Sequence, residues 1–304
     1  MPPMDARAVF SKVDEASEDQ AAFRLVARDP PPTPLVFASP HSGRHYPAEM
    51  LTAAAVEPEA LHRSEDAFVD QLIAPAAEAG AALILARYGR AFMDLNRDPW
   101  ELDPTMFSDE LPVFAQGRTA RVAAGLGAIA RTAGEGREIY ARKLTFAEAQ
   151  ARVAKAHAPY HDALDRLLAR ARNAHGMAVL IDWHSMPEAA AKTAVTPRHG
   201  KGCDIVLGDR FGAACTRKLT DLVEKELEGM GYRVARNAPY AGGYTTEHYG
   251  RPASRTHALQ IEISRALYLD EETLAPTDGL DRLTGDIGKL TAVLAEGWPK
   301  LRPA

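Results

Sequence analysis

Short apolar runs recur along the chain and are separated by longer amphipathic or polar stretches. Residues 35–39 (LVFAS), 81–89 (AALILARYG) and 177–184 (MAVLIDWH) consist almost entirely of apolar side chains. Such runs are typical of short strands that are buried on both faces of a sheet. Shorter runs of the same kind predict three more strands, at 204–208, 232–237 and 258–264.

The segments between these runs carry a helical pattern. From Thr145 to His175, apolar side chains recur at a spacing of three and four residues, which predicts a long helix with a candidate break at Pro159. The segment Ser64 to Gly80 begins with a good N-cap and an acidic first turn, which predicts a second helix that Pro75 kinks. Two further helices are expected, at 212–230 and 279–296.

Buried strands that alternate with long helices predict an α/β fold with a mostly parallel (mixed) sheet and helices on both faces. Residues 1–24 are polar and acidic, and we expect them to form an N-terminal arm. We interpret residues 25–304 as a single domain, because neither an internal repeat nor a composition break divides them. Within this domain, residues 98–140 are polar and interrupted by Gly and Pro, which predicts an irregular excursion.

The composition is that of an ordinary globular protein, since 46% of the 304 residues are hydrophobic and 25% are charged. A net charge of −5 disfavours nucleic-acid binding. The first twenty residues lack the apolar core of a signal peptide, and no apolar run approaches the ~18 residues that suggest a membrane span. Two cysteines without a CxxC motif suit a reducing compartment. We therefore expect a cytoplasmic protein.

Residues suited to a metal site stand at or near the ends of several predicted strands. His41 and His184 follow or close two of these strands, and Glu262 lies within a third. Ligands of open α/β sheets bind beyond the carboxyl ends of the strands, so we expect these side chains to converge. A fourth strand leads into a polar segment with three candidate side chains, Asp94, Asn96 and Arg97.

This set of residue types suits a catalytic zinc ion (Zn2+). Such an ion takes three His or carboxylate ligands and leaves one position for a water, whose pKa falls to about 7. A nearby carboxylate can then carry the proton of the water to a leaving amine. His41 and His184 fit the ligands and Glu262 fits the base, while the third ligand is either Glu65 or Asp66. A single His after a strand is more often structural, so the hypothesis rests on their convergence.

The segment from Ala241 to Arg251 is rich in glycine and in side chains that form hydrogen bonds. Glycines allow a backbone to approach a ligand closely, so we interpret this segment as a flexible substrate loop. Its candidate substrate-binding residues are Tyr244, Thr245, His248 and Arg251.

Two other patterns carry less weight. Residues 125–130 fit the dinucleotide motif G-x-G-x-x-A, but no convincing strand precedes them, which disfavours a nicotinamide cofactor. His157 and His161 have the spacing of a helical metal pair, but Ala158 stands where the HExxH motif needs a glutamate. We interpret these two histidines as surface or packing residues.

Six short motifs follow one another in the order found in the N-formylglutamate amidohydrolase family. Together they span most of the chain, from about residue 35 to 270. The motifs are P-H-S-G at 40–43, E-D with V-D at 65–70, R-Y-G-R with D-L-N-R at 87–97, D-W-H-S at 182–185, G-G-Y-T with H-Y-G-R at 242–251, and L-Q-I-E at 259–262. Each motif is weak alone, but six in this order make the chain resemble that family.

The resemblance implies a fold of the zinc-carboxypeptidase and phosphorylase/hydrolase-like type with one catalytic zinc ion. His41 and His184 match the metal ligands of the family, and Asp66 matches the third ligand better than Glu65 does. Glu262 matches the general base.

The resemblance also implies a substrate and a reaction. Asn96 and Arg97 resemble the pair that grips a substrate carboxylate, a task that suits a guanidinium group. The family hydrolyses N-formyl-L-glutamate to formate and L-glutamate in histidine degradation, which makes a small molecule the expected partner, with no nucleic acid or membrane. Trp183 departs from the small residue usual before this His, so two alternatives stay open: a carboxypeptidase-like hydrolase of another N-acyl amino acid or peptide, and a metal-free binding protein.

Overall fold

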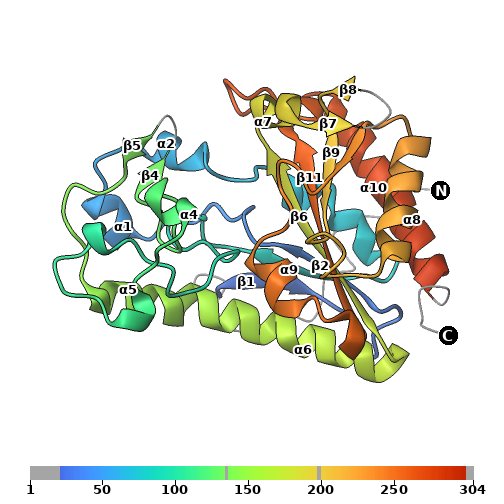
Figure 1. The fold of residues 1–304 in the computed structure, drawn as a ribbon, viewed down its shortest axis with the longest axis horizontal. Helices are drawn as coiled ribbons and strands as arrows, with labels where there is room; N and C mark the ends of the chain where they lie inside the picture. Colours follow the sequence, from blue (N-terminus) through green and yellow to red (C-terminus); the bar gives the residue numbers. More distant parts are fainter. Residues whose placement is uncertain (1–20, 134–135, 197–199, 299–304) are drawn as a thin grey trace, which may run out of the picture.

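A seven-stranded mixed sheet forms the centre of the computed structural model, which describes residues 21–133, 136–196 and 200–298 (Figure 1). The strand order is β1-β3-β2-β6-β11-β9-β10. The strands are β1 (Phe23–Val26), β2 (Leu35–Ser39), β3 (Ala82–Ala86), β6 (Ala178–Met186), β9 (Ile205–Gly208), β10 (Val234–Arg236) and β11 (Thr256–Ser264). The four strands β3, β2, β6 and β11 run parallel to one another. Strand β1 pairs antiparallel with β3, and β9 pairs antiparallel with β11 but parallel with β10. The predicted mixed, mostly parallel sheet is therefore confirmed.

The sheet separates two apolar cores. Val36 and Ala38 of β2 face one core, and Leu35 and Phe37 of the same strand face the other. Every residue of β6 and β11 is buried. Strands covered on both faces favour apolar side chains at most positions, which explains the apolar runs in their sequences; the polar side chains Asp182, His184 and Glu262 are the exceptions that form the site.

Helices cover both faces of the sheet, as predicted. One face carries a long helix that consists of α5 (Phe146–Arg152), a π-helical turn η5 (Val153–His157) and α6 (Ala158–His175). Thr145 caps its start in a capping box with Glu148. The opposite face carries four elements, α3 (Val69–Leu72), η2 (Ala74–Ala77), α8 (Arg217–Gly229) and α10 (Gly279–Gly297).

The single helix predicted from Ser64 to Gly80 is wrong. The segment contains only the short α3 and the 3-10 helix η2. The backbone N–H of Asp66 donates a hydrogen bond to the carbonyl of His41 (3.0 Å), and Phe68 adopts a left-handed φ of 64°. Because helix propensities differ by less than about 1 kcal/mol per residue, such tertiary contacts easily outweigh them.

Residues 98–140 fold beside the sheet as short, irregular elements, which Figure 1 shows on the side away from α8 and α10. They are η3 (Pro104–Met106), η4 (Val113–Ala115), α4 (Ala120–Ala123), β4 (Thr132–Ala133) and β5 (Arg137–Glu138). The smaller elements elsewhere are α1 (Ala48–Ala53), α2 (Pro58–His62), α7 (Glu188–Thr193), β7 (Val195–Thr196), β8 (Gly200–Lys201), α9 (Tyr244–Tyr249), η6 (Pro252–Ser254) and η7 (Arg265–Leu267).

The expected N-terminal arm lies mostly outside the described residues, which begin at residue 21. Phe23 and Arg24, which that arm included, belong to β1 and pair with β3. Among the described residues, no helix combines the length and apolar character needed to cross a membrane.

Candidate functional site

Three side chains converge where β2 and β6 end. His41 Nδ1 lies 3.4 Å from Asp66 Oδ2 and 3.1 Å from His184 Nδ1, and His184 Nδ1 lies 3.0 Å from Asp66 Oδ2. All three side chains are at most 3% exposed. These separations are close to those between the ligands of a tetrahedral zinc ion with ligand distances of about 2.0–2.2 Å.

Two buried carboxylates hold the far sides of the histidine rings. His41 Nε2 donates a hydrogen bond to Asp94 Oδ1 (2.7 Å). His184 Nε2 pairs with Asp182 Oδ2 (3.1 Å), and Asn96 Nδ2 lies 2.9 Å from the same nitrogen. A carboxylate only accepts, so each Nε2 keeps its proton and each Nδ1 can present a lone pair to the centre of the cluster. Ligand histidines are oriented in this way in metal sites.

The charges of the cluster favour a cation at its centre. Burial alone would raise the pKa of Asp66, but the adjacent imidazole rings of His184 and His41 hold that pKa well below its usual range. Burial would lower the pKa of His184, but Asp182 and Asp66 raise it well above the ordinary value. Two imidazole nitrogens and a carboxylate oxygen in mutual contact therefore favour a positive charge between them, which a metal ion supplies. The donor set fits zinc.

The structure brings Asp66, and not Glu65, to the two histidines. Glu65 Oε1 accepts hydrogen bonds from the hydroxyl of Tyr46 (2.9 Å) and from His62 Nδ1 (2.8 Å), on the other side of the chain. Asp66 Oδ1 accepts a hydrogen bond from Arg265 (3.3 Å), which leaves Oδ2 directed at the histidines. Of the two acids left open by residue type and position, only Asp66 therefore lies against the two histidines.

Glu262 lies beside this cluster on β11. It pairs in register with His184 of β6, and Gln260 pairs with Asp182. Burial raises the pKa of Glu262 to about 7; His184 lowers it and Asp66 raises it further. Gln260 Nε2 donates a hydrogen bond to Glu262 Oε1 (2.7 Å). A carboxyl group with a pKa near 7 can accept and return a proton at neutral pH.

The segment after β3 contributes to both the cluster and the pocket in front of it. Asn96 Nδ2 donates a hydrogen bond to Asp182 Oδ2 (3.3 Å), and Asn96 Oδ1 accepts one from the backbone of Thr245 (2.8 Å). Arg97 lines the pocket, and Nε and Nη1 donate to the carbonyls of Leu126 (3.2 Å) and Asn96 (2.9 Å). Burial lowers the pKa of Arg97. Within the described residues no carboxylate forms a close ion pair with this guanidinium, and Asp94 attracts it from a greater distance.

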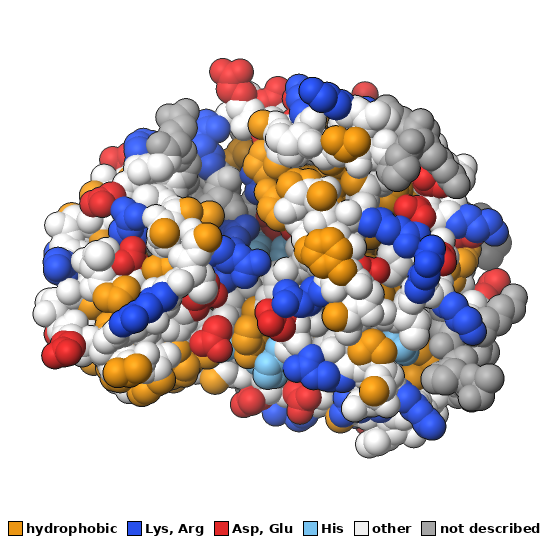
Figure 2. Space-filling model, in the orientation of Figure 1, with side chains coloured by type: hydrophobic (Ala, Val, Ile, Leu, Met, Phe, Trp, Pro, Cys, Tyr) orange, Lys and Arg blue, Asp and Glu red, His pale blue; other side chains and the backbone are white. Residues whose placement is uncertain are grey.

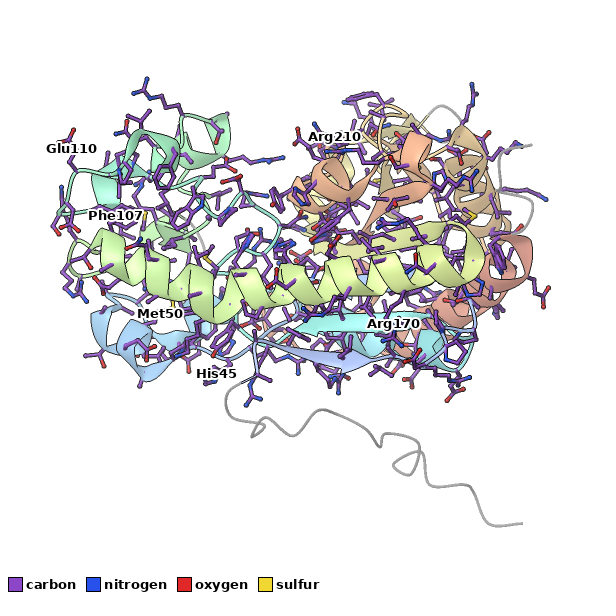
Figure 3. The ribbon with its side chains drawn as sticks, turned by 90° about the horizontal axis from the view of Figure 1, so that it is seen from below. His45, Met50, Phe107, Glu110, Arg170 and Arg210 are labelled. Atoms are coloured by element: carbon purple, nitrogen blue, oxygen red, sulfur yellow. The ribbon has the colours of Figure 1, made fainter. Side chains whose placement is uncertain are left out.

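A pocket of about 870 Å³ opens in front of the cluster. Figure 2 shows a hollow in this face with Lys and Arg side chains around it. Arg210, from the segment after β9, lies across the cleft from the part of the chain that contains Phe107 (Figure 3). The lining contains twice as many arginines as acidic residues: Arg63, Arg90, Arg97, Arg121, Arg210 and Arg265 against Asp66, Asp94 and Glu262. This excess of positive charge favours an anionic ligand.

The predicted flexible loop at 241–251 is wrong as a description of the backbone, because residues 244–249 form the helix α9. Its first residues, Ala241 to Gly243, line the pocket. A Cβ at Gly243 would lie 2.5 Å from the side-chain amide of Asn96, so only glycine fits there.

The four side chains predicted to bind substrate belong to or follow α9 and lie beside the pocket, outside its lining as the described residues define it. Tyr244 and His248 stack on each other at 5.0 Å between ring centroids, and Thr245 contacts Asn96 through its backbone. Arg251 donates hydrogen bonds to the carbonyls of Glu247 and Gly250. Their substrate-binding role stays a prediction.

Sequence reasoning overlooked the residues behind the ligands. Asp182 stands two positions before His184 on the same strand, so the D-x-H spacing already placed both side chains on one face. Asp94 was noticed near a strand end, but not as the partner of His41. Arg90 donates a hydrogen bond to Asp94 Oδ2 (2.8 Å) and had no signal beyond its place in a motif.

Known proteins share this architecture. The family model for N-formylglutamate amidohydrolase matches residues 33–269. The N-formylglutamate deformylase of Pseudomonas aeruginosa is 31% identical over 243 residues, which are 79% of this chain and 83% of that protein. The N-formylglutamate deformylase of Pseudomonas putida is 30% identical over 241 residues, which are 78% of this chain and 82% of that protein.

Solved structures agree. The crystal structure of N-formylglutamate amidohydrolase from Ralstonia eutropha JMP134 superposes with a TM-score of 0.85 at 38% identity, and the match covers 92% of this chain and 99% of that one. A gene product of Agrobacterium tumefaciens, 19% identical with a TM-score of 0.65 over 93% of this chain and 98% of its own, shares the fold. The chain belongs to the N-formylglutamate amidohydrolase family.

Proposed function

We propose that this protein is a zinc-dependent amidohydrolase that converts N-formyl-L-glutamate and water to formate and L-glutamate. The convergence of His41, Asp66 and His184 beside Glu262, at the base of one pocket, is the observation that carries this proposal. Two relatives that are about 30% identical over most of their length are named N-formylglutamate deformylases, which supports the substrate.

The residues of the site divide the reaction between them. When bound by His41, Asp66 and His184, zinc supplies a Lewis acid that lowers the pKa of water to about 7. Asp94 and Asp182 keep the two imidazole rings in orientation through their Nε2 protons. Glu262 accepts a proton from the attacking water and returns it to the amide nitrogen as the C–N bond breaks. The formyl carbon leaves as formate with the oxygen of water, and the nitrogen stays on glutamate.

Arg97 recognises the substrate in this proposal. Its side chain is 9% exposed and lines the pocket, and its Nε and Nη1 donate hydrogen bonds to backbone carbonyls. A buried cation without a close acidic partner in the described chain is costly, and a substrate carboxylate relieves that cost. Asn96 also lines the pocket, and its amide contacts Asp182, His184 and the backbone of Thr245. We assign Asn96 to the support of the metal site.

The experiment combines metal analysis with a substrate panel. Metal content is measured by elemental analysis, and formate release from N-formyl-L-glutamate is followed before chelation, after chelation and after zinc is restored. We expect about one zinc ion per chain and activity that disappears and returns with it. Full activity in a metal-free protein would overturn the mechanism, and a metal-free, inactive protein would favour the binding-protein alternative.

The size of the pocket favours one alternative substrate class. A volume of about 870 Å³ is near the upper end of the ~300–1,000 Å³ typical of small-molecule sites, which leaves room for a longer N-acyl amino acid or a short peptide. N-acetyl-L-glutamate and dipeptides with a C-terminal glutamate are therefore included in the panel. If one of them is hydrolysed with a higher kcat/KM than N-formyl-L-glutamate, the substrate assignment is wrong while the zinc mechanism stands.

A further inference from the structure

The long helix beneath the site contains one π-helical turn, η5, which changes which side chains share a face of the helix. In an α-helix, residues four positions apart lie on the same face, whereas in a π-helical turn the interval is five. Arg152, His157 and His161 are spaced by five and then by four residues, and η5 occupies the first interval. The widened turn therefore brings Arg152 and His157 onto the same face of the helix as His161.

That face contacts the segment that enters the site from β3. Figure 3 shows the long helix running beneath both sides of the cleft. All three side chains donate hydrogen bonds to backbone carbonyls of residues 92–97: Arg152 Nη1 to Phe92 (3.1 Å), His161 Nε2 to Leu95 (2.8 Å) and His157 Nε2 to Arg97 (3.0 Å). The helix thus holds this segment at three points along its length.

The two histidines are buried and neutral. His157 is 4% exposed and His161 is 9% exposed, so of the two predicted alternatives, surface or packing, they are packing residues. Burial lowers the pKa of His157, and it lowers the pKa of His161 to about 3. Because a carbonyl only accepts, each Nε2 carries the proton, and His161 Nδ1 is left to accept from the hydroxyl of Tyr249 (2.9 Å). Each ring is thereby fixed in one tautomer.

The segment they hold delivers three functional side chains. Asp94 orients His41, Asn96 supports the Asp182 that orients His184, and Arg97 lines the pocket. The carbonyls of Leu95 and Arg97 lie within this same stretch of backbone. A shift of the backbone would therefore displace a metal-ligand partner and the substrate-binding guanidinium together, and misplacements of about 1 Å can cost 10²-fold in rate.

We propose that His157 and His161 are positioning residues that fix residues 94–97, and that the π turn exists to align them. His161 acts mainly on the metal site, because it holds the carbonyl between Asp94 and Asn96. His157 acts mainly on substrate binding, because it holds the carbonyl of Arg97 itself. The kinetic part of this inference rests on the proposed function, and the metal-affinity part does not.

The test compares two amides of different reach at each position. In His157→Gln and His161→Gln, the side-chain amide places a donor near the position of Nε2, whereas in the Asn variants the donor falls short. His175→Asn and His175→Gln are the matched controls, because His175 ends the same helix and contacts the carbonyl of Pro31 (2.8 Å) far from the site. For each variant we measure the zinc dissociation constant by chelator competition, kcat and KM for formate release, and the Tm.

We expect His161→Asn to weaken zinc binding by about 10-fold or more, the range seen when a partner of a metal ligand is lost. We expect His157→Asn to raise KM by about 10-fold with a smaller change in kcat, because the hydrogen bond it removes orients a charged group. The Gln variants stay within about 3-fold of the wild type, and the His175 variants change only the Tm.

If the Asn and Gln variants of His157 and His161 are alike, or change only the Tm as those of His175 do, the positioning role is wrong. A wild type that binds zinc but releases no formate would refute the proposed substrate, and the zinc constants of the His161 variants would still decide this inference.

Discussion

The two sides of the pocket are built in different ways. On the sheet side, His41, His184 and Glu262 stand at strand ends, are at most 7% exposed, and contact side chains that are themselves buried. On the excursion side, residues 98–140 form short irregular elements, and Arg121 reaches the pocket from the four-residue helix α4. Arg121 has no carboxylate partner among the described residues. In the proposed function, the sheet side carries out the reaction, and Arg97 together with the excursion side binds the substrate.

The difference between the two sides shows which atoms of the site must be placed precisely. A metal site requires ligand atoms placed to within a few tenths of an ångström, and a sheet with carboxylates behind each ligand provides that. Recognition of an anion requires positive charge in roughly the right place, which a long flexible side chain on an irregular segment can provide. Substitutions on the sheet side should therefore affect kcat and zinc binding, and those on the excursion side should affect KM.

The largest effect is expected for Glu262→Gln. Loss of the proton carrier should lower kcat by about 10²–10⁴-fold while zinc content stays near one ion per chain. The control is Glu188→Gln, which makes the same change on the exposed helix α7. Steady-state formate release together with metal analysis measures both quantities. A kcat within 3-fold of the wild type would show that Glu262 is not the base.

The next effect is expected for Asp182→Asn. The amide no longer accepts the Nε2 proton of His184 as strongly, so zinc affinity should fall by about 10–100-fold. Asp165→Asn on the exposed side of α6 is the control. Chelator competition gives the dissociation constants, and equal constants for both variants would remove Asp182 from the metal site.

A smaller effect is expected for Arg97→Gln, on KM rather than on zinc binding. Loss of a charged hydrogen bond should raise KM for N-formyl-L-glutamate by about 10-fold. Comparison with N-formyl-L-glutamine shows which carboxylate Arg97 contacts, since a penalty confined to the glutamate substrate identifies the side-chain carboxylate. An unchanged KM for both substrates would contradict its role in recognition.

Arg121→Gln should have a weaker effect of the same kind. Its side chain is exposed, so its interaction with an anionic substrate is screened, and KM should rise by no more than about 5-fold. The difference from the wild type should shrink as salt is raised from 20 to about 500 mM. A rise in KM that does not depend on salt would indicate that Arg121 contacts the substrate directly in a desolvated site, as proposed for Arg97.

The smallest effect concerns stability and pH. The pKa of His161 is lowered to about 3 by burial, so the unfolded chain binds its proton more readily than the folded one. The stability associated with this neutral ring is present above pH 6.5 and is lost as the pH falls from 6.5 towards 3. In His161→Gln the decline between pH 7 and 5 should be shallower than in the wild type. Urea unfolding of the metal-free proteins measures it, and identical slopes would contradict the buried neutral state.

The elements that the sequence predicted correctly are the central strands, whose apolar sequences follow from burial along their whole length. The strands ending near His41 and His184 were correct because both faces of the sheet are covered, and the strand of Glu262 was correct for the same reason. Alternation along β11 separates Glu262 from its two neighbours, because Glu262 lies beside the cluster while Ile261 and Ile263 face the opposite core.

The parts that sequence missed depend on single long-range contacts. A local helical pattern runs through Asp66, but its hydrogen bonds to His41, His184 and Arg265 turn the chain there instead. The roles of His157 and His161 depend on a π turn, which no residue spacing in the sequence predicts. Local patterns contain no information about such partners, so only the folded structure reveals them.

The most direct test of the central claim is a crystal structure with anomalous diffraction data collected at the zinc absorption edge. The account predicts one anomalous peak about 2.0–2.2 Å from Nδ1 of His41, Oδ2 of Asp66 and Nδ1 of His184, with Nε2 of both rings still bonded to Asp94 and Asp182. A zinc-loaded protein without a peak at this position, or with the ion held by other residues, would contradict it.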